Sequence, residues 1–503
     1  MSTRSQTSLR PAPSRLRVSV AASLAAAFPA ILSIALAGGI VLSPTVAMGA
    51  FLVAAAAVLG IFIERIGPPV VVGVLLYLPL QDFVLKYLSG APLLAARYGP
   101  ELFLDAVLLV LVLTRLSFIA QRLGKVGAGL ALLVTFWICT AALNQVDAST
   151  MLIGLRNELR FVPLLIIPLL SANVRRDARR YARVIVLAGA LQAGLALFQY
   201  VGGEAVRSWF ISSYQVSLGD VVVGRVDVSS RDIVGTFSHR NFLGVYLAFA
   251  WIVLASAGAK ELGFSRRNGL IIGWALVIAT LLSTSREGAI AILVAALLIG
   301  RKRFQWPLAR LAGATVLVLF VVVASTPGLS QSSLATTSLV GRWTALVNPS
   351  NFIAKGENNF RLFFLASSAR TTIQESPVYG LGLGVASDPR LLTDRSSPIF
   401  RTVSGYDPSY IAAFIYDSNW AFLLLEVGFG GLLVLLWVLL LLYKMGRDLK
   451  DHWLGTVLSS CVVAVVTLGF FGPVLQQRAP TAIFWVIAGL AIALAAAPRE
   501  QTP

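Results

Sequence analysis

The feature that most constrains this chain is a series of apolar runs, each about as long as a membrane is thick. A helix needs about 20 apolar residues to cross the hydrocarbon core of a bilayer, and such runs recur from residue 19 to residue 497. Hydrophobic residues form 57% of the 503 residues and charged residues only 13%, against about 25% in soluble domains. A soluble domain cannot bury so much apolar surface. The sequence therefore predicts an all-α polytopic membrane protein.

We expect about fourteen transmembrane helices. The run at 158–172 is short, and the stretch 269–300 is too long for one crossing, so we divide it at the polar segment 283–288. The expected spans are 19–38, 43–63, 69–88, 101–119, 127–144, 158–172, 183–201, 239–257, 269–284, 286–300, 308–326, 418–443, 454–473 and 480–497.

The distribution of charge predicts the orientation of these spans. With the N-terminus in the cytoplasm, alternation places 24 of the 41 basic residues and six of the 23 acidic residues on the cytoplasmic side. That side then carries the whole net charge of +18, and the outer side is neutral, as the preference of basic residues for cytoplasmic loops requires. Topology and anionic lipid thus explain the basic excess, and nucleic acid is not an expected partner.

This topology divides the chain into seven segments. They are a basic cytoplasmic tail (1–18), N-terminal transmembrane helices (19–201), a periplasmic loop (202–237), transmembrane helices with a Ser-Arg hairpin (238–326), a large periplasmic loop (327–417), C-terminal transmembrane helices (418–497) and a cytoplasmic tail (498–503). Cytoplasmic loops are short, whereas the loop 327–417 is far longer than a connecting turn. The working surface is therefore expected on the outer side.

Several classes of site are excluded by composition. The chain has only two histidines, His239 and His452, and two cysteines, Cys139 and Cys461, both within apolar runs and expected to be core thiols. This set is too small for a His/Cys metal cluster, so we expect no metal site. No nucleotide-binding glycine motif and no inverted pair of broken helices is found, which argues against an ATP-driven pump or a transporter.

Charged residues at membrane depth are functional candidates because they are costly there. Arg286 lies at the outer tip of the predicted hairpin, where a guanidinium and a helix N-terminus would face an anion. The alternative is a solvated turn in which Glu287 pairs with Arg286. His239 opens a long apolar helix and is the only histidine on the predicted outer face, so proton transfer or phosphate binding is possible. The alternative is a surface histidine next to an N-cap formed by Ser238.

Further polar residues lie in or beside the two long loops. Arg231 belongs to a run of alternating charges that also fits a solvated loop. Arg361 lies among phenylalanines at helical spacing, which indicates a surface helix within the large loop. The segment 376–384 is rich in glycine and weakly resembles a phosphate-binding loop. Asp417 is either functional or a helix cap, and Glu426, two turns inside the next span, is either functional or bonded to a neighbouring helix.

The order of these motifs resembles the O-antigen ligase and polymerase superfamily of bacterial inner-membrane glycan enzymes. The motifs are Gly-Thr-Phe-Ser-His-x-Asn-x-Leu at 235–243, Ser-Arg-x-Gly at 285–288, Arg361, Ser-Pro-x-x-Gly-x-Gly-x-Gly at 376–384, and the segment from Asn419 through Glu426 to Gly431. The resemblance covers about residues 230–435. It implies a GT-C-like fold and a metal-independent, cofactor-free glycosyltransferase that acts at the periplasmic face on a glycan carried by undecaprenyl diphosphate.

Two positions depart from the family pattern. Ligases have an essential histidine just before the asparagine that opens the late helix, and this chain has Ser418 there. The family often has proline after the earlier histidine, where this chain has Arg240. The missing histidine favours polymerisation of an exopolysaccharide, capsule or O-antigen over ligation to lipid A-core.

The chemistry of such a transfer assigns roles to the residues. Arginines neutralise a diphosphate leaving group through bidentate contacts, and a weak base takes the proton of the attacking sugar hydroxyl. The expected catalytic residues are His239, Asp417 and Arg286, and the expected substrate-binding residues are Arg231, Arg240, Asn241, Arg361, Asn419 and Glu426.

The prediction is therefore a polymerase of lipid-linked repeat units, embedded in the bacterial inner membrane with its active site facing the periplasm. Membrane lipid is a partner, and a chain-length regulator would be a further one. A ligase that transfers the glycan to lipid A-core or another acceptor is the alternative within the family. A lipid-linked glycan flippase or transporter is the alternative of another class, although its charges should line a central cavity at mid-membrane depth.

Overall fold

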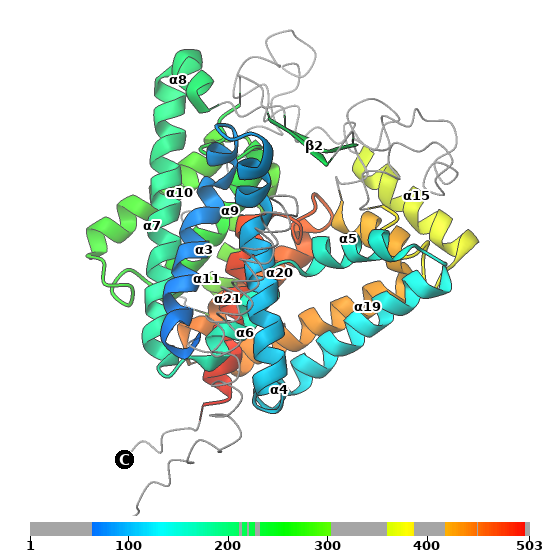
Figure 1. Ribbon diagram of the computed structural model, residues 1–503. Coiled ribbons are helices and arrows are strands. Elements are labelled where there is room, and N and C mark those ends of the chain that lie inside the picture. Colours follow the sequence, from blue (N-terminus) through cyan, green and yellow to red (C-terminus); the bar gives the residue numbers. More distant parts are fainter. Residues whose placement is uncertain are drawn as a thin grey trace, which may run out of the picture.

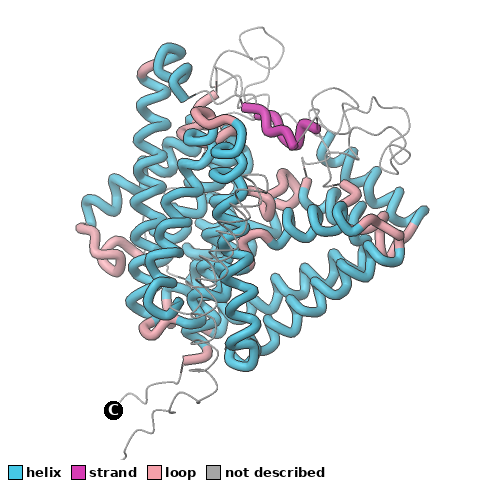
Figure 2. Tube along the Cα trace, viewed as in Figure 1, coloured by secondary structure: helices cyan, strands magenta, loops and turns pink. Residues whose placement is uncertain are grey.

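The structure is a computed structural model, and it describes residues 63–210, 214–218, 221–226, 232–302, 360–386, 418–449 and 451–497. Within these segments the chain is almost entirely helical (Figure 2), and one antiparallel pair of short strands is present. The prediction of an all-α class is thereby confirmed for this part of the chain. The spans predicted at 19–38, 43–63 and 308–326 lie outside the described residues, so the count of fourteen stays a prediction.

The elements are labelled in Figure 1. In chain order they are α3 (Ile63–Leu85), α4 (Gly90–Leu143), α5 (Ala148–Leu159), α6 (Pro163–Ile166), η1 (Ile167–Leu170), α7 (Val174–Val201), α8 (Gly203–Phe210), β1 (Tyr214–Leu218), β2 (Val221–Val226), α9 (Arg240–Ala257), α10 (Arg266–Leu282), α11 (Arg286–Lys302), α15 (Phe360–Glu375), α19 (Asn419–Asp448), α20 (Trp453–Leu468) and α21 (Arg478–Ala495).

Six helical segments of the described chain are long and apolar enough to cross a membrane. They are Gly67–Leu85, Pro92–Leu143, Val174–Val201, Arg240–Ala257, Asn419–Asp448 and Arg478–Ala495. The second has 52 residues and contains two predicted spans, 101–119 and 127–144. Its backbone is non-helical at Gly124, with φ 50° and ψ −128°, and Figure 1 shows α4 reversing direction at its lower end. A conformation with positive φ suits glycine, which lacks a Cβ.

The prediction of a span at 158–172 is wrong. The chain there forms the end of α5, the four-residue α6 and the four-residue 3₁₀ helix η1. Pro163 and Pro168 lack a backbone N–H and disfavour helical geometry in the residue before them, which favours the break into two short pieces. The broken segment is nonetheless buried from Pro163 to Leu170, and it packs against α21 and the end of α3.

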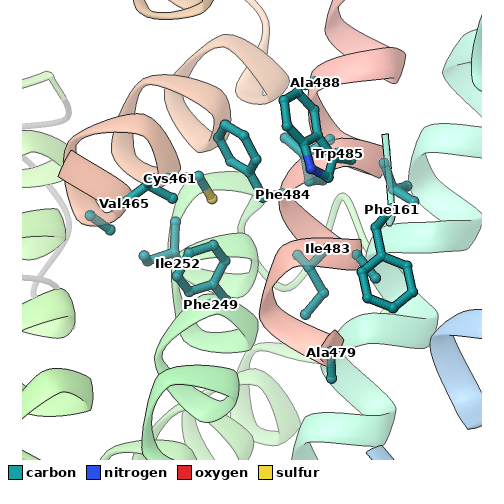
Figure 3. Packing of buried hydrophobic residues seen from close by; sticks show 14 of the residues in the cluster. Phe161, Phe249, Ile252, Cys461, Val465, Ala479, Ile483, Phe484, Trp485 and Ala488 are labelled. Carbon is teal, nitrogen blue, oxygen red and sulfur yellow. The ribbon is translucent and has the colours of Figure 1, made fainter. Parts of the chain in front are cut away.

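Two helices form the centre of the bundle. All residues of α9 from Leu243 to Ala257 and of α21 from Ala479 to Ala493 are buried, as expected for helices that are apolar on every side. The helices α7, α10, α11 and α20 pack around α9. Figure 3 shows side chains of α9, α20 and α21, among them Phe249, Cys461 and Phe484, meeting in one apolar core. Cys461 is a buried free thiol, as predicted, whereas Cys139 is exposed.

A second group of helices leans away from this bundle in Figure 1: the later part of α4, together with α5, α15 and α19. Within it, α19 is kinked at Gly428, with φ 65° and ψ −173°. A loop that follows α15 fills the kink, and four backbone hydrogen bonds of 2.7–3.1 Å join the two segments. They run from Leu381 and Gly382 to the carbonyls of Leu425 and Glu426, and from Phe429 and Gly430 to those of Pro377 and Val378. The helix break therefore leaves these backbone groups bonded, as a membrane environment requires.

Basic loops meet at one end of the bundle. Near the start of α7, Arg179 forms an ion pair of 2.7 Å with Glu261, which lies in the α9–α10 loop. Arg183 lies over the ring of Phe264 in the same loop, 5.6 Å from its centroid. His452 is the N-cap of α20. Burial is the main cause that lowers the pKa of its imidazole. The nearby charge of Glu261 raises this pKa, and those of Arg175 and Arg179 lower it further. Three loops predicted on the cytoplasmic side thus lie together.

The orientation is testable by cysteine labelling. Arg176 is exposed at the basic end, and Ser208 is exposed on α8, which continues the chain beyond the other end of α7. In a variant with Cys139 and Cys461 replaced by alanine, we expect Ser208→Cys to react with an impermeant maleimide in intact spheroplasts. Arg176→Cys should react only after permeabilisation, because basic loops remain in the cytoplasm. The reverse pattern would overturn the orientation.

Candidate functional site

Polar side chains gather at the end of the bundle opposite the basic loops. They come from the end of α3, the start of α4, the end of α5, the start of α9, the α10–α11 turn and the start of α21. Figure 1 shows α3, α9, α11 and α21 in the main bundle and α5 in the group beside it. In the predicted topology this is the outer end. The hydrogen bonds and ion pairs given below join these elements into one continuous group.

His239 is the N-cap of α9. Its backbone is extended, with φ −149° and ψ 143°, and its Nδ1 atom accepts the backbone N–H of Asn241 at 3.2 Å. The cap is therefore His239 and not Ser238. The imidazole is exposed, and its ring centroid lies 5.6 Å from that of Phe242. Because Nδ1 accepts a hydrogen bond, the neutral ring carries its proton on Nε2 and presents a donor outward.

The next two residues connect α9 to the α10–α11 turn. Arg240 Nη1 lies 3.3 Å from Asp232 Oδ1 and 3.4 Å from Thr284 Oγ1. Asn241 Nδ2 donates to Glu287 Oε1 at 2.8 Å. The first turn of α9 is thereby fixed against the tip of the hairpin that carries Arg286.

The predicted break between 269–284 and 286–300 is confirmed, since α10 ends at Leu282 and α11 begins at Arg286. Within the turn Thr284 has a positive φ of 55°, and Ser285 Oγ accepts the N–H of Gly288 at 3.1 Å. A Cβ atom on Gly288 would lie 2.5 Å from the carbonyl oxygen of Gly244, so glycine permits α9 and α11 to touch. Arg286 is half-buried at the first residue of α11, where helical N–H groups favour anions.

Glu287 is buried and joins three elements. Its Oε1 accepts from Asn241 of α9, and its Oε2 accepts from Gln477 Nε2 at 3.2 Å, at the start of α21. The simpler alternative for this turn was an Arg286–Glu287 pair exposed to solvent. Glu287 is instead buried, and each of its carboxylate oxygens accepts a hydrogen bond from a side-chain amide of a neighbouring element. The Oε1 atom of Gln477 is buried and has no hydrogen-bond partner among the described residues.

Three arginines surround one buried carboxylate, that of Glu101 in α4. Arg156 forms an ion pair with its Oε2. Arg160 Nη1 and Arg478 Nε lie 3.8 Å and 3.5 Å from its Oε1. Arg478 Nη1 also donates to Gln81 Oε1 at 2.8 Å. Glu101 therefore holds together α4, the end of α5 and the start of α21, and one negative charge faces three positive ones.

A cavity of about 200 Å³ lies beside this cluster. Its charged lining residues are Arg97, Arg160, Arg478 and Asp82, and Gln477, Ser238 and Phe242 also face it. Asp82 Oδ2 accepts the backbone N–H of Ser238 at 2.9 Å, which connects the cavity wall to the α9 cap. Burial lowers the pKa of Arg160 to about 10, so its guanidinium stays protonated at neutral pH. The described lining is thus positively charged.

Glu158 is a second buried acid near the cavity. It lies in α5, outside the membrane-length helices, and its Oε1 accepts from Gln476 Nε2 at 2.6 Å. Gln476 also lines the cavity. Burial raises the pKa of Glu158 to about 7, against the lowering effects of the Gln476 hydrogen bond and of Arg160. The carboxyl group therefore gains and loses its proton near neutral pH.

Of the residues predicted as functional, His239, Arg240, Asn241 and Arg286 are brought together around the first turns of α9 and α11. Arg361 belongs to α15, which packs against α19. The positions Arg231 and Asp417 lie outside the described residues.

Asn419 begins α19 and is completely buried, with neither side-chain Oδ1 nor Nδ2 hydrogen-bonded among the described residues. The cap of this helix is Ser418, whose Oγ accepts from Ala421 N–H and donates to the carbonyl of Gly469 at 3.1 Å. The capping role considered for Asp417 is thus filled by Ser418, the residue that replaces the histidine of the ligases.

Glu426 lies at the kink of α19, and its Oε1 accepts the backbone N–H of Ala386 at 3.0 Å. This bond fits the structural alternative for Glu426. The comparison of the glycine-rich segment with a phosphate-binding loop is wrong, because the N–H groups of Leu381 and Gly382 donate to α19. The glycines allow close packing: a Cβ atom on Gly380 would lie 2.5 Å from the backbone nitrogen of Gly428.

The cluster around Glu101 was not predicted from the sequence. Arg97, Arg156 and Arg478 lie in predicted outer loops, and that shared position was the available signal, whereas Arg160 lies inside the predicted span 158–172. What the sequence did not show is that the N-terminal helices and the last helix converge there. That convergence depends on tertiary packing between α4, α5 and α21.

Comparisons of the sequence with protein-family models and with curated proteins gave no match. Among the described residues, no group of three or more His, Cys, Asp or Glu side chains has a geometry that could hold a metal ion. In the described part of the site, the positively charged groups that could bind an anionic substrate are arginine side chains.

The role of Glu101 can be measured directly. Glu101→Gln removes the one carboxylate that the three arginines share, and breaking such a buried ion pair costs about 3–5 kcal/mol. We expect a correspondingly lower free energy of unfolding for the full-length protein in detergent micelles, followed by tryptophan fluorescence. Glu261→Gln is the matched control, since its pair with Arg179 is exposed and such pairs contribute about 0–1 kcal/mol. Equal effects would contradict a central role for Glu101.

Glu158 predicts a pH dependence of stability. In the unfolded chain this group titrates near 4.5, and in the folded protein near 7, so between these pH values the folded protein keeps a proton that the unfolded chain releases. The free energy of unfolding should therefore fall as pH rises from about 4.5 to about 7, by at most about 3 kcal/mol. Glu158→Gln should flatten this decline, whereas Glu204→Gln, on the exposed face of α8, should not. Parallel pH profiles for wild type and Glu158→Gln would refute the assignment.

Proposed function

We propose that this protein is a glycosyltransferase that polymerises lipid-linked repeat units of a surface polysaccharide at the periplasmic face of the bacterial inner membrane. The donor is a glycan on undecaprenyl diphosphate, and the acceptor is the end of another lipid-linked unit. The observation that carries the proposal is the polar site at one end of an apolar helical bundle, in which arginines from several helices gather beside an exposed histidine.

The arginines suit a diphosphate leaving group. A guanidinium group is planar, stays charged and can bind two phosphate oxygens at once. Donors that are held in place before the reaction stabilise charge that develops in the transition state. Arg240 is held by Asp232 and Thr284, and Arg286 starts a helix whose cap and glycine contact are fixed. This geometry favours an anion at the α10–α11 turn.

The orientation of His239 bears on its role. With Nδ1 accepting from Asn241, its Nε2–H is a donor and suits a phosphate or sugar oxygen. To act as a base through Nε2, the ring would have to carry its proton on Nδ1 and give up the helix cap, a loss of about 1 kcal/mol. We therefore assign His239 first to substrate binding, and proton acceptance from the attacking hydroxyl to Asp417.

Ser418 favours polymerase over ligase. In the ligases that the sequence resembles, this position carries the essential histidine. Here its side chain is 1% exposed and bonded to Gly469, so it serves the helix terminus and not a substrate. A flippase is disfavoured because the central helices α9 and α21 are packed by apolar side chains, and the clustered charges of the described residues lie at the ends of the bundle.

The test is the chain length of the surface polysaccharide in a deletion strain complemented with variants. Loss of the gene should leave lipid-linked single units, whereas long unattached chains would indicate a ligase and units held at the cytoplasmic face a flippase. Arg286→Lys keeps the charge but loses the planar fork, and losing one such donor costs about 10²–10³-fold in rate. We expect Arg286→Lys to insert normally and to make little polymer, while Arg179→Lys, at the basic end, restores it fully. Wild-type polymer from Arg286→Lys would exclude the α10–α11 turn as the donor site.

A further inference from the structure

We propose that the cavity beside Glu101 is a second diphosphate site, separate from the α10–α11 turn, and that it holds the headgroup of the second lipid-linked unit. The inference rests on the proposed function. It concerns residues of α4, α5 and α21 that lie outside the motifs on which the resemblance to the glycan enzymes rests.

The cavity offers groups that suit a glycosyl diphosphate. Arg160 bonds to Asn157 through Nε and Nη2, at 3.2 and 3.0 Å. Its Nη1 lies 3.8 Å from Glu101, which is beyond hydrogen-bond distance. Nη1 therefore has hydrogens to offer to a phosphate oxygen. Gln477 is 2% exposed and lines the same cavity, and its Oε1 has no partner among the described residues. This atom would accept a hydroxyl of the first sugar.

The charge around the cavity also calls for an anion. Three arginines, at positions 97, 160 and 478, line the cavity against one carboxylate, that of Asp82, among the described lining residues. Glu101, Glu158 and Glu287 lie behind this lining, in contact with its arginine and glutamine side chains. Glu158 loses half its charge near neutral pH because burial raises its pKa to about 7. Charges removed from water are costly unless they are compensated. A bound diphosphate supplies that compensation.

Glu287 separates this cavity from the α10–α11 turn. Its buried carboxylate stands between Asn241, on the side of Arg240 and Arg286, and Gln477, on the side of Arg478. A negative charge held in a low-dielectric position repels an anion placed across it. The two sets of arginines therefore form two sites and not one extended site.

Polymerisation has a use for two such sites. A hydroxyl of the acceptor unit attacks the anomeric carbon of the donor, a new glycosidic bond forms, and the bond from that carbon to the donor diphosphate breaks. The diphosphate leaves with the electron pair, and the hydroxyl proton passes to a base. The acceptor keeps its own diphosphate throughout, so two headgroups must be held together. A cavity of about 200 Å³ is smaller than ligand pockets of about 300–1,000 Å³, which suits a headgroup better than a whole repeat unit.

The test counts lipid diphosphates on the full-length protein in nanodiscs by native mass spectrometry, with undecaprenyl diphosphate as the probe. We expect two equivalents for wild type. Arg160→Gln should leave one equivalent, with the other weakened at least about tenfold, since a hydrogen bond to a charged group contributes about 1.5–3 kcal/mol. Ser238→Leu should also leave one equivalent, because the larger side chain fills the cavity without a change of charge. The hydrogen bond from Ser238 to Asp82 is kept in this variant, since the backbone N–H is its donor. Arg286→Lys should remove the other equivalent, and Arg179→Gln should remove neither.

The outcomes separate this inference from the proposed function. A single equivalent that is lost in Arg286→Lys and kept in both Arg160→Gln and Ser238→Leu would overturn the second site while leaving the polymerase intact. The second site would also be overturned if inorganic pyrophosphate bound in the cavity and undecaprenyl diphosphate did not. The cavity would then bind a free anion and not a lipid headgroup. Normal polymer in the deletion strain would instead refute the proposed function itself. Two equivalents, one removed by each set of substitutions, would establish the second site.

Discussion

The ion pairs of Glu101 are the interaction on which the polar end of this protein depends. One carboxylate, 1% exposed, fixes arginines from the end of α5 and the start of α21. Those two segments are separated by more than 300 positions in the chain, and apolar contacts between α6, η1 and α21 bring them close. The hydrophobic effect that brings these helices together is non-directional, so polar contacts add to side-chain packing in fixing their rotation and register. The directional contacts at Glu101 set the register, and through Arg478 and Gln477 they reach Glu287 and the hairpin of Arg286.

At the polar end, several charged groups each bond to more than one element. Glu287 connects α9, α11 and α21, Asp82 connects α3 to the α9 cap, and Arg240 connects the segment before α9 to the α10–α11 turn. Such shared contacts restrict each side chain to few positions, which lowers the entropy lost when a substrate binds. The site is therefore arranged before substrate arrives. This is the condition under which fixed dipoles and charges lower a reaction barrier.

The sequence predicted the helical class, the break before Arg286 and the clustering of basic loops, because each follows from local hydropathy and charge. It failed at 158–172, where an apolar run with Pro163 and Pro168 forms two short buried pieces instead of one continuous helix. It predicted His239, Arg240, Asn241 and Arg286 as site residues through a motif order, and the structure places them near one another. The arginines around Glu101 belong to no such motif. Their proximity arises from contacts between distant helices, which hydropathy along one chain does not encode. The glycines at 380–384 were misread because glycine serves close packing as readily as phosphate binding.

The insertion of the loop 377–382 into the kink of α19 fixes both ends of the segment 387–417. Ala386 is bonded to Glu426, and Ser418 is bonded to Gly469, so the segment leaves and rejoins the fold within the first two turns of one helix. The anchoring bonds along α19 are mostly made by backbone atoms and do not depend on the loop's own side chains. The helices that carry the arginines are therefore joined at this kink by bonds to which residues 387–417 contribute nothing.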